Sequence, residues 1–124
     1  MANILIVDDS IIMRRNLKTI FTKAGHNVIA EASNGQQALQ LYEKFLPDVV
    51  TMDITMPNVN GIEAVKLIIS KYPDAKIIII SGLDQKNVVY SALEYGAKHY
   101  IIKPISEKKV LDILDAVLNN HNST

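Results

Sequence analysis

The chain has 124 residues, and 48% of them are hydrophobic, which is enough to build the core of one domain of ordinary size. Thirteen Lys and Arg residues balance thirteen Asp and Glu residues, and this zero net charge argues against nonspecific binding to nucleic acid or to an anionic membrane. The absence of cysteine excludes disulfides, a thiolate nucleophile and cysteine-bound metals. No apolar run is long enough to span a membrane and no signal sequence is recognisable, so we expect one cytoplasmic domain over residues 1–124.

Short apolar runs rich in β-branched residues predict strands at residues 4–7, 28–32, 49–52, 77–80 and 100–102. These runs do not alternate with polar residues, which is typical of strands buried on both faces of a parallel sheet. Helical spacing of apolar residues predicts helices around residues 13–24, 38–45, 62–69, 88–93 and 110–118. The order of strand and helix, repeated five times, indicates an α/β fold in which helices cover both faces of a parallel sheet.

The residues that flank these segments support the predicted boundaries. Asn34, Asp84 and Ser106 each precede an apolar periodic stretch and are predicted to cap the N-terminus of the helix that follows. Gly25 follows the first helix and is predicted at its C′ position. Because only X-Pro bonds tolerate the cis form cheaply, the Lys103–Pro104 bond is a candidate for a cis peptide, with an ordinary trans turn as the alternative.

Polar or charged residues end four of the predicted strands, and these residues are the candidate functional site. Asp8 and Asp9 follow the first strand, Asp53 the third, Ser81 the fourth and Lys103 the fifth. Taken singly, each residue is explained as a helix cap, a turn residue or a solvated strand end. Open parallel sheets, however, bind ligands at the carboxyl ends of their strands, where three carboxylates, a hydroxyl and an ammonium group would meet.

The chemistry of this set points to phosphoryl transfer. Three carboxylates in one crevice repel each other unless a cation joins them, and oxygen ligands without His or Cys favour Mg²⁺. Asp53 is predicted to attack phosphorus as a nucleophile and to form an acyl phosphate. Lys103 would pair with Asp53 before transfer and with phosphoryl oxygens after it, while the Ser81 hydroxyl would donate a hydrogen bond to another phosphoryl oxygen.

Four segments carry a family resemblance: ILIVDD ending at Asp9, VVTMDITMPNVNG ending at Gly61, IIIISG ending at Gly82 and GAKHYIIKP ending at Pro104. With them, nearly the whole chain resembles a response regulator receiver domain of two-component signalling. The resemblance implies a doubly wound, five-stranded parallel sheet of strand order 2-1-3-4-5, with five helices on its two faces, as in flavodoxin.

The same resemblance implies roles for the site residues. Asp53 is the implied phosphoacceptor, and Lys103 and Ser81 are the implied catalytic partners. The implied Mg²⁺ ligands are Asp9, Asp53 and the backbone carbonyl of Thr55, with Asp8 acting mostly through a metal-bound water. No other cofactor is implied.

Ser81 and Tyr100 occupy the positions of the family's switch. The resemblance implies that phosphorylation draws the Ser81 hydroxyl toward the phosphoryl group and lets the Tyr100 ring turn from exposed to buried, reshaping the face of the fourth helix, fifth strand and fifth helix. From the sequence alone, Tyr100 is interpreted as an ordinary aromatic residue of a strand.

Thr55 and Leu83 are the positions that bear on the lifetime of the phosphorylated state. Leu83 is apolar where the best-known chemotaxis members carry a polar residue, which implies slower self-dephosphorylation.

The segments 13–15 and 51–57 look more like the chemotaxis group of receivers than like sporulation phosphorelay intermediates. The implied partners are a histidine kinase as phosphoryl donor, the flagellar motor switch protein as target, and a phosphatase; neither nucleic acid nor membrane is expected. We expect a monomer that signals by docking and that is not a turnover enzyme. The alternatives are a phosphorelay intermediate and a receiver cut from a longer regulator with an output domain.

Three alternative functions, each from another class of protein, fit the sequence less well. A phosphohydrolase of the haloacid dehalogenase kind needs a second aspartate where this chain has Thr55, which cannot exchange a proton near neutral pH. An FMN-binding flavodoxin needs a phosphate-binding loop after the first strand, where this chain has two carboxylates. A purely structural pseudo-receiver would have lost an acidic or lysine position, and this chain keeps all of them.

Overall fold

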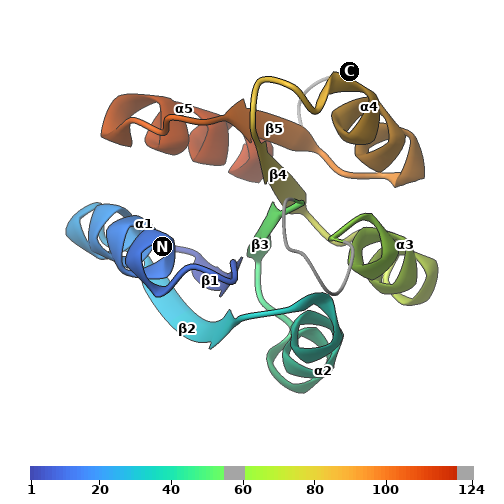
Figure 1. The fold of residues 1–124 in the computed structure, drawn as a ribbon. Helices are drawn as coiled ribbons and strands as arrows, with labels where there is room; N and C mark the ends of the chain where they lie inside the picture. The colour runs from blue at the N-terminus through green and yellow to red at the C-terminus, as the bar shows by residue number, and fades with distance from the viewer. Residues whose placement is uncertain (55–60, 120–124) are drawn as a thin grey trace.

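The computed structural model describes residues 1–54 and 61–119 and shows, within them, five strands alternating with five helices (Figure 1). The strands are β1 (Asn3–Val7), β2 (Asn27–Ala32), β3 (Val49–Asp53), β4 (Ile77–Ser81) and β5 (His99–Ile102). The helices are α1 (Ile11–Lys23), α2 (Gly35–Phe45), α3 (Gly61–Lys71), α4 (Lys86–Tyr95) and α5 (Glu107–Leu118). Each strand boundary lies within one residue of its predicted position.

The strands form one parallel sheet in the order β2-β1-β3-β4-β5, which confirms the predicted fold. Each strand is followed by a helix that returns the chain to the starting edge of the sheet, as parallel pairing requires. In this register Val7 lies beside Met52, and Ser81 lies beside Ile102. The carboxyl ends of β1, β3, β4 and β5 therefore lie side by side at one edge.

The sheet separates two hydrophobic cores, and Figure 1 shows α1 and α5 on one face of the sheet and α2, α3 and α4 on the other. Successive residues of β4 go to opposite faces, with Ile77 and Ile79 in one core and Ile78 and Ile80 in the other. The first core is completed by α2, α3 and α4, and the second by α1 and α5. This arrangement explains why the strands are apolar throughout, because both faces of the sheet are covered.

Two predicted N-caps and one predicted helix end are confirmed. Asn34 Oδ1 accepts a hydrogen bond from the Gln37 amide at 2.9 Å, and Ser106 Oγ accepts one from the Lys109 amide at 3.2 Å. Gly25 follows the C-cap of α1 with φ 91°, a conformation that suits glycine because it has no Cβ. The Lys103–Pro104 peptide is cis.

The predicted cap of α4 is wrong. Helix α4 begins at Lys86, and its N-cap is Gln85, whose side chain makes no capping hydrogen bond. Asp84 lies one residue too early, inside a turn that the Gln85 amide closes on the Gly82 carbonyl at 3.3 Å. The Gln85 side chain accepts a hydrogen bond from the Gly82 amide at 2.9 Å and so stabilises this turn in place of the helix terminus.

Among the helices of the described residues, none has the length and apolar character needed to cross a membrane.

Candidate functional site

The candidate residues meet at one edge of the sheet, as the topology predicts. Asp53 ends β3 and Ser81 ends β4, whereas Asp8 and Asp9 follow β1 and Lys103 follows β5. Because these four strands are neighbours in the order β1-β3-β4-β5, residues from four separate parts of the sequence lie at the same edge of the sheet. Thr55, the predicted source of a carbonyl ligand, lies outside the described residues.

The three aspartates form a compact acidic cluster. One carboxylate oxygen from each of Asp8, Asp9 and Asp53 lies within 4.8 Å of the others. Asp8 and Asp53 are each only 1% exposed, while Asp9 is exposed to solvent. Two buried carboxylates and one exposed carboxylate thus lie close to one another, and burial strengthens the repulsion between the charges of Asp8 and Asp53.

This environment changes the acidity of Asp8. Burial raises the pKa of the Asp8 carboxyl from 3.8 to about 6. The hydrogen bond from the Ser10 amide to Asp8 Oδ1, at 2.8 Å, acts in the opposite direction because it stabilises the ionised form. The negative charge of Asp53 raises the pKa further, and the Lys103 ammonium lowers it. A carboxylate held in this way is stabilised by any cation that enters the cluster.

Lys103 connects the cluster to β5. Its ammonium nitrogen lies 3.5 Å from Asp53 Oδ2, and its side chain is 30% exposed. Its amide donates a hydrogen bond to the Ser81 carbonyl at 2.7 Å, so the backbones that carry Lys103 and Ser81 are held together. The Ser81 hydroxyl is fully buried and finds no hydrogen-bond partner within the described part of the chain. A buried, unpartnered hydroxyl at the same sheet edge as Asp53 is able to donate a hydrogen bond to an incoming oxygen.

The donor set fits a hard divalent cation. The cluster offers carboxylate oxygens, which Mg²⁺ prefers, and it lacks the nitrogen and sulfur ligands that zinc selects. Asp8 Oδ2 is buried without a hydrogen-bond partner among residues 1–54 and 61–119, which leaves one carboxylate oxygen available as a ligand or as an acceptor for a metal-bound water. The cluster is therefore compatible with the predicted Mg²⁺ site.

Gly61, the first residue of α3, packs directly against the end of β3. A Cβ atom at Gly61 would lie 2.8 Å from the Asp53 carbonyl oxygen and 3.0 Å from the Ile54 Cα atom. Both atoms belong to the backbone, so neither can move aside without shifting the segment that carries Asp53. The site therefore depends on a close approach that only glycine permits.

Tyr100 lies away from the acidic cluster, on the face made by α4 and β5. It is 39% exposed, and it lines a small groove of about 110 Å³. Leu83, two residues beyond Ser81, lies in the same groove and is 74% exposed. The remaining lining residues come from α4 and β5: Lys86, Val89, Tyr90 and Ile102. The two predicted switch residues thus lie on connected elements, with Ser81 buried and Tyr100 at the surface.

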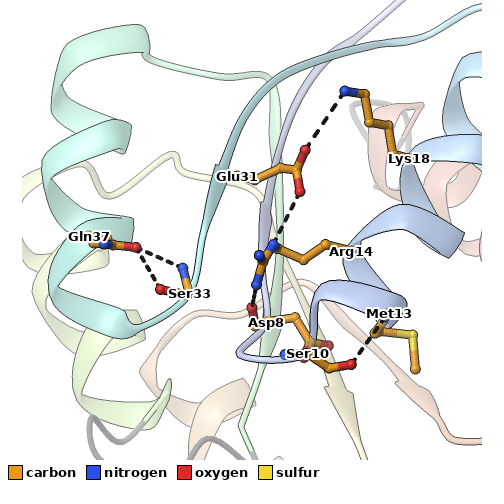
Figure 2. Close-up of polar contacts among 8 residues, drawn as sticks. All are labelled: Asp8, Ser10, Met13, Arg14, Lys18, Glu31, Ser33 and Gln37. Carbon is orange, nitrogen blue, oxygen red and sulfur yellow. Dashed lines mark hydrogen bonds and ion pairs between the residues drawn. The ribbon is translucent and has the colours of Figure 1, made fainter.

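The pattern of polar residues at strand ends does not identify two polar residues on the elements that carry the site, Ser10 and Thr51. Ser10 caps α1 through a hydrogen bond from the Met13 amide at 3.2 Å (Figure 2), and a serine just before an apolar periodic stretch is a signal that the sequence does contain. Thr51 lies within β3, and its hydroxyl is buried without a partner in the described residues. No sequence pattern distinguishes Thr51, because threonine is common in strands.

The fold and the site together define the class of this protein. A family model of the response regulator receiver domain matches residues 4–115. The chain therefore belongs to the response regulator receiver domain family, as the strand-end motifs predict.

Its relatives include chemotaxis proteins of the CheY type. The chain is 48% identical to chemotaxis protein CheY of Thermotoga maritima over 114 residues, which cover 92% of this chain and 95% of that protein. It is 46% identical to chemotaxis protein CheY of Bacillus subtilis over 116 residues, 94% of this chain and 97% of that protein. Among solved structures, the CheX-CheY-BeF₃-Mg complex from Borrelia burgdorferi matches with a TM-score of 0.89 and 39% identity, covering 93% of this chain and 87% of that chain.

Proposed function

We propose that residues 1–124 form a single receiver domain that a histidine kinase phosphorylates on Asp53 and that signals by binding a partner protein. The observation that carries this proposal is the Asp53 carboxylate, which is buried, lies 3.5 Å from the Lys103 ammonium and shares its pocket with two further carboxylates. A buried acidic cluster of this kind is costly for folding, and chemistry is the usual reason for such a cost.

In the proposed reaction, an Asp53 carboxylate oxygen forms a bond to phosphorus while the bond from phosphorus to the donor's imidazole nitrogen breaks. The electron pair of the broken bond leaves with the imidazole, and Asp53 becomes an acyl phosphate. Bound Mg²⁺, held by Asp9, Asp53 and the Thr55 carbonyl and by Asp8 mostly through a water, would neutralise negative charge on the cluster and the phosphoryl group.

Lys103 and Ser81 act on the phosphoryl oxygens. Lys103 is paired with Asp53 before transfer, and the same ammonium can pair with a phosphoryl oxygen afterwards. The Ser81 hydroxyl has no partner to give up within the described residues, so a hydrogen bond to the phosphoryl group is a net gain. These interactions exist only after phosphorylation, and their free energy is therefore available to shift the conformation of the protein.

The conformational change is proposed to run from Ser81 to Tyr100. Movement of the Ser81 hydroxyl toward the phosphoryl group would displace the segment between β4 and α4, and the Tyr100 ring would turn inward from its exposed position. Reversing a two-state equilibrium from mostly inactive to mostly active takes about 5 kcal/mol. A few charge-assisted hydrogen bonds together with burial of one aromatic ring supply a free energy of that order.

The proposed output is chemotaxis, with the flagellar motor switch protein as target. This proposal is supported by the CheY relatives, which match the chain over nearly their whole length. The structural relative from Borrelia burgdorferi is a CheY in complex with CheX, and we propose that a protein of that kind binds this chain, in addition to the phosphatase that the family resemblance implies. The domain is not proposed to be a turnover enzyme, since its own aspartate is the acceptor.

The first experiment is intact-mass measurement after incubation with acetyl phosphate and Mg²⁺. We expect the protein to gain one phosphoryl group, about 80 Da, and to lose this gain in EDTA. Asp53→Asn, which preserves the shape of the side chain, should gain no mass, whereas Asp84→Asn, at an exposed aspartate beyond β4, should behave like the original protein. An adduct that persists in Asp53→Asn, or no adduct at any Mg²⁺ concentration, would contradict the proposed function.

A further inference from the structure

Arg14, on the second turn of α1, makes two hydrogen bonds that join three elements of the fold (Figure 2). Its Nη1 donates to the backbone carbonyl of Asp8 at 2.6 Å, and its Nε donates to Glu31 Oε1, on β2, at 3.1 Å. The Arg14 side chain is only 16% exposed. A planar guanidinium group held at two points has little freedom to leave this position.

The carbonyl that Arg14 binds belongs to the peptide that links Asp8 to Asp9. Because a peptide unit is planar, fixing its oxygen fixes the orientation of the whole unit and the direction in which the next residue starts. The Asp8 amide is held by the Ala32 carbonyl at 3.0 Å, so the chain is already fixed on the other side of Asp8. The peptide after Asp9 is held by the hydrogen bond from the Ser10 amide to Asp8 Oδ1, and Arg14 holds the peptide before it.

Asp9 depends on these contacts because its own side chain has no anchor. Within residues 1–54 and 61–119, the exposed Asp9 carboxylate makes no hydrogen bond or ion pair. Its place in the acidic cluster, within 4.8 Å of oxygens of Asp8 and Asp53, is consequently set by the backbone. A cation site needs its ligands at fixed separations, so the backbone conformation at Asp9 affects affinity directly.

The positive charge of Arg14 does not explain its position. A guanidinium group near the acidic cluster repels a divalent cation, so charge alone would weaken cation binding. Glu31 offsets this effect, because its carboxylate binds Arg14 Nε and also lies 3.8 Å from the Lys18 ammonium. The hydrogen bond from Arg14 to the Asp8 carbonyl is then the favourable contribution that this residue makes to the site.

We propose that Arg14, oriented by Glu31, is a positioning residue that holds the Asp8–Asp9 peptide in the conformation required for Mg²⁺ binding. This inference rests on the proposed function, since it assigns Arg14 a part in the same cation site. It predicts that loss of Arg14 weakens Mg²⁺ binding, whereas loss of the positive charge alone would strengthen it. The two explanations are therefore separable by measurement.

The test is isothermal titration of Mg²⁺ into the unphosphorylated protein. Arg14→Gln should bind Mg²⁺ about tenfold more weakly, as is typical when a residue that supports metal ligands is lost. Arg14→Lys keeps the charge but loses the two-point geometry, and it should be weakened to a similar extent. The matched control is Arg15→Gln, which removes the same charge from an exposed residue without ion pairs or hydrogen bonds in the described chain, and it should bind unchanged or slightly more tightly.

A second readout separates positioning from a general loss of structure. The phosphorylated fraction, measured by intact mass against Mg²⁺ concentration, should reach the original maximum in Arg14→Lys but at about tenfold higher Mg²⁺. A maximum that stays low at every Mg²⁺ concentration, or a Mg²⁺ affinity of both Arg14 variants equal to or tighter than that of the original protein, overturns the inference. Failure of the original protein to bind Mg²⁺ or to be phosphorylated instead overturns the proposed function, and with it the assignment of Arg14.

Discussion

Asp8→Asn is expected to stabilise the cation-free protein near neutral pH and to have a much smaller effect in acid. The pKa of Asp8 is about 6 in the folded protein against 3.8 for an ordinary aspartate, so the folded state binds the Asp8 proton more tightly than the unfolded state does. The stabilisation from this proton is complete below pH 3.8 and is lost as the pH rises through 6.

The size of the effect follows from the shift in pKa. At about 1.4 kcal/mol for each unit, the difference between the folded and unfolded values corresponds to about 3 kcal/mol in all, of which about 2 kcal/mol is lost between pH 4.5 and pH 7.5. Asn is neutral at every pH, it keeps an oxygen to accept from the Ser10 amide, and its amino group can donate to Asp53 as protonated Asp8 does. The unfolding free energy of the variant should therefore not contain this loss between pH 4.5 and pH 7.5.

The assay is urea unfolding in EDTA at pH 4.5 and pH 7.5, followed by circular dichroism. The gain in unfolding free energy from Asp8→Asn should be about 2 kcal/mol larger at pH 7.5 than at pH 4.5. Asp9→Asn, which removes the same charge from an exposed position, is the control and should show a much smaller change. Mg²⁺ should reduce the advantage of the variant at pH 7.5, because a bound cation stabilises the ionised carboxylate of the original protein. Equal effects of Asp8→Asn at the two pH values would refute the reasoning.

Three further substitutions test other features of the site. Gly61→Ala, whose methyl group would meet the Asp53 carbonyl at 2.8 Å, should lower the unfolding free energy by about 1 to 3 kcal/mol and slow phosphorylation. The control is Gly25→Ala, which has open space around it but φ 91°; it should lower the unfolding free energy by about 1 kcal/mol and leave phosphorylation unchanged. Normal phosphorylation of Gly61→Ala would contradict the close approach of Gly61 to the Asp53 carbonyl. Thr51→Val replaces a buried, unpartnered hydroxyl and should raise the unfolding free energy by about 1 kcal/mol in urea titration, and a loss of stability would show that the hydroxyl is satisfied. Leu83→Asn should shorten the lifetime of the acyl phosphate, followed by loss of the phosphoryl mass, because the family resemblance implies that a polar residue at this position assists attack by water; an unchanged lifetime would leave Leu83 only its place in the groove beside Tyr100.

Much of the fold is predictable because its signals are local. Each strand is an apolar run of strand length, and both faces of the sheet are covered, so the runs need no alternation. The start of α4 is harder, because the polar residues Asp84 and Gln85 are adjacent and both could cap a helix. The turn between Gly82 and Gln85 decides between them, and the sequence does not reveal which hydrogen bonds that turn makes.

The site is predictable only in part. The meeting of Asp8, Asp9 and Asp53 follows from the rule that parallel strands bring their carboxyl ends to one edge. The sequence does not predict that Asp8 is buried and Asp9 exposed, because two identical adjacent residues give no sign of which side chain points inward. The contact of Arg14 with Glu31 depends on how α1 packs along β2, a tertiary relationship between residues seventeen positions apart that no local pattern records.

The division of the core by the sheet has a consequence for how such a protein can vary. The packing of α1 and α5 is separated from that of α2, α3 and α4 by a layer of hydrogen-bonded backbone, so changes of side-chain volume under α4 and under α5 should have nearly additive effects on stability. Each layer can then accumulate core substitutions largely on its own. The shared edge, where Asp53 and Lys103 meet, keeps its geometry because both layers are built on the same strands.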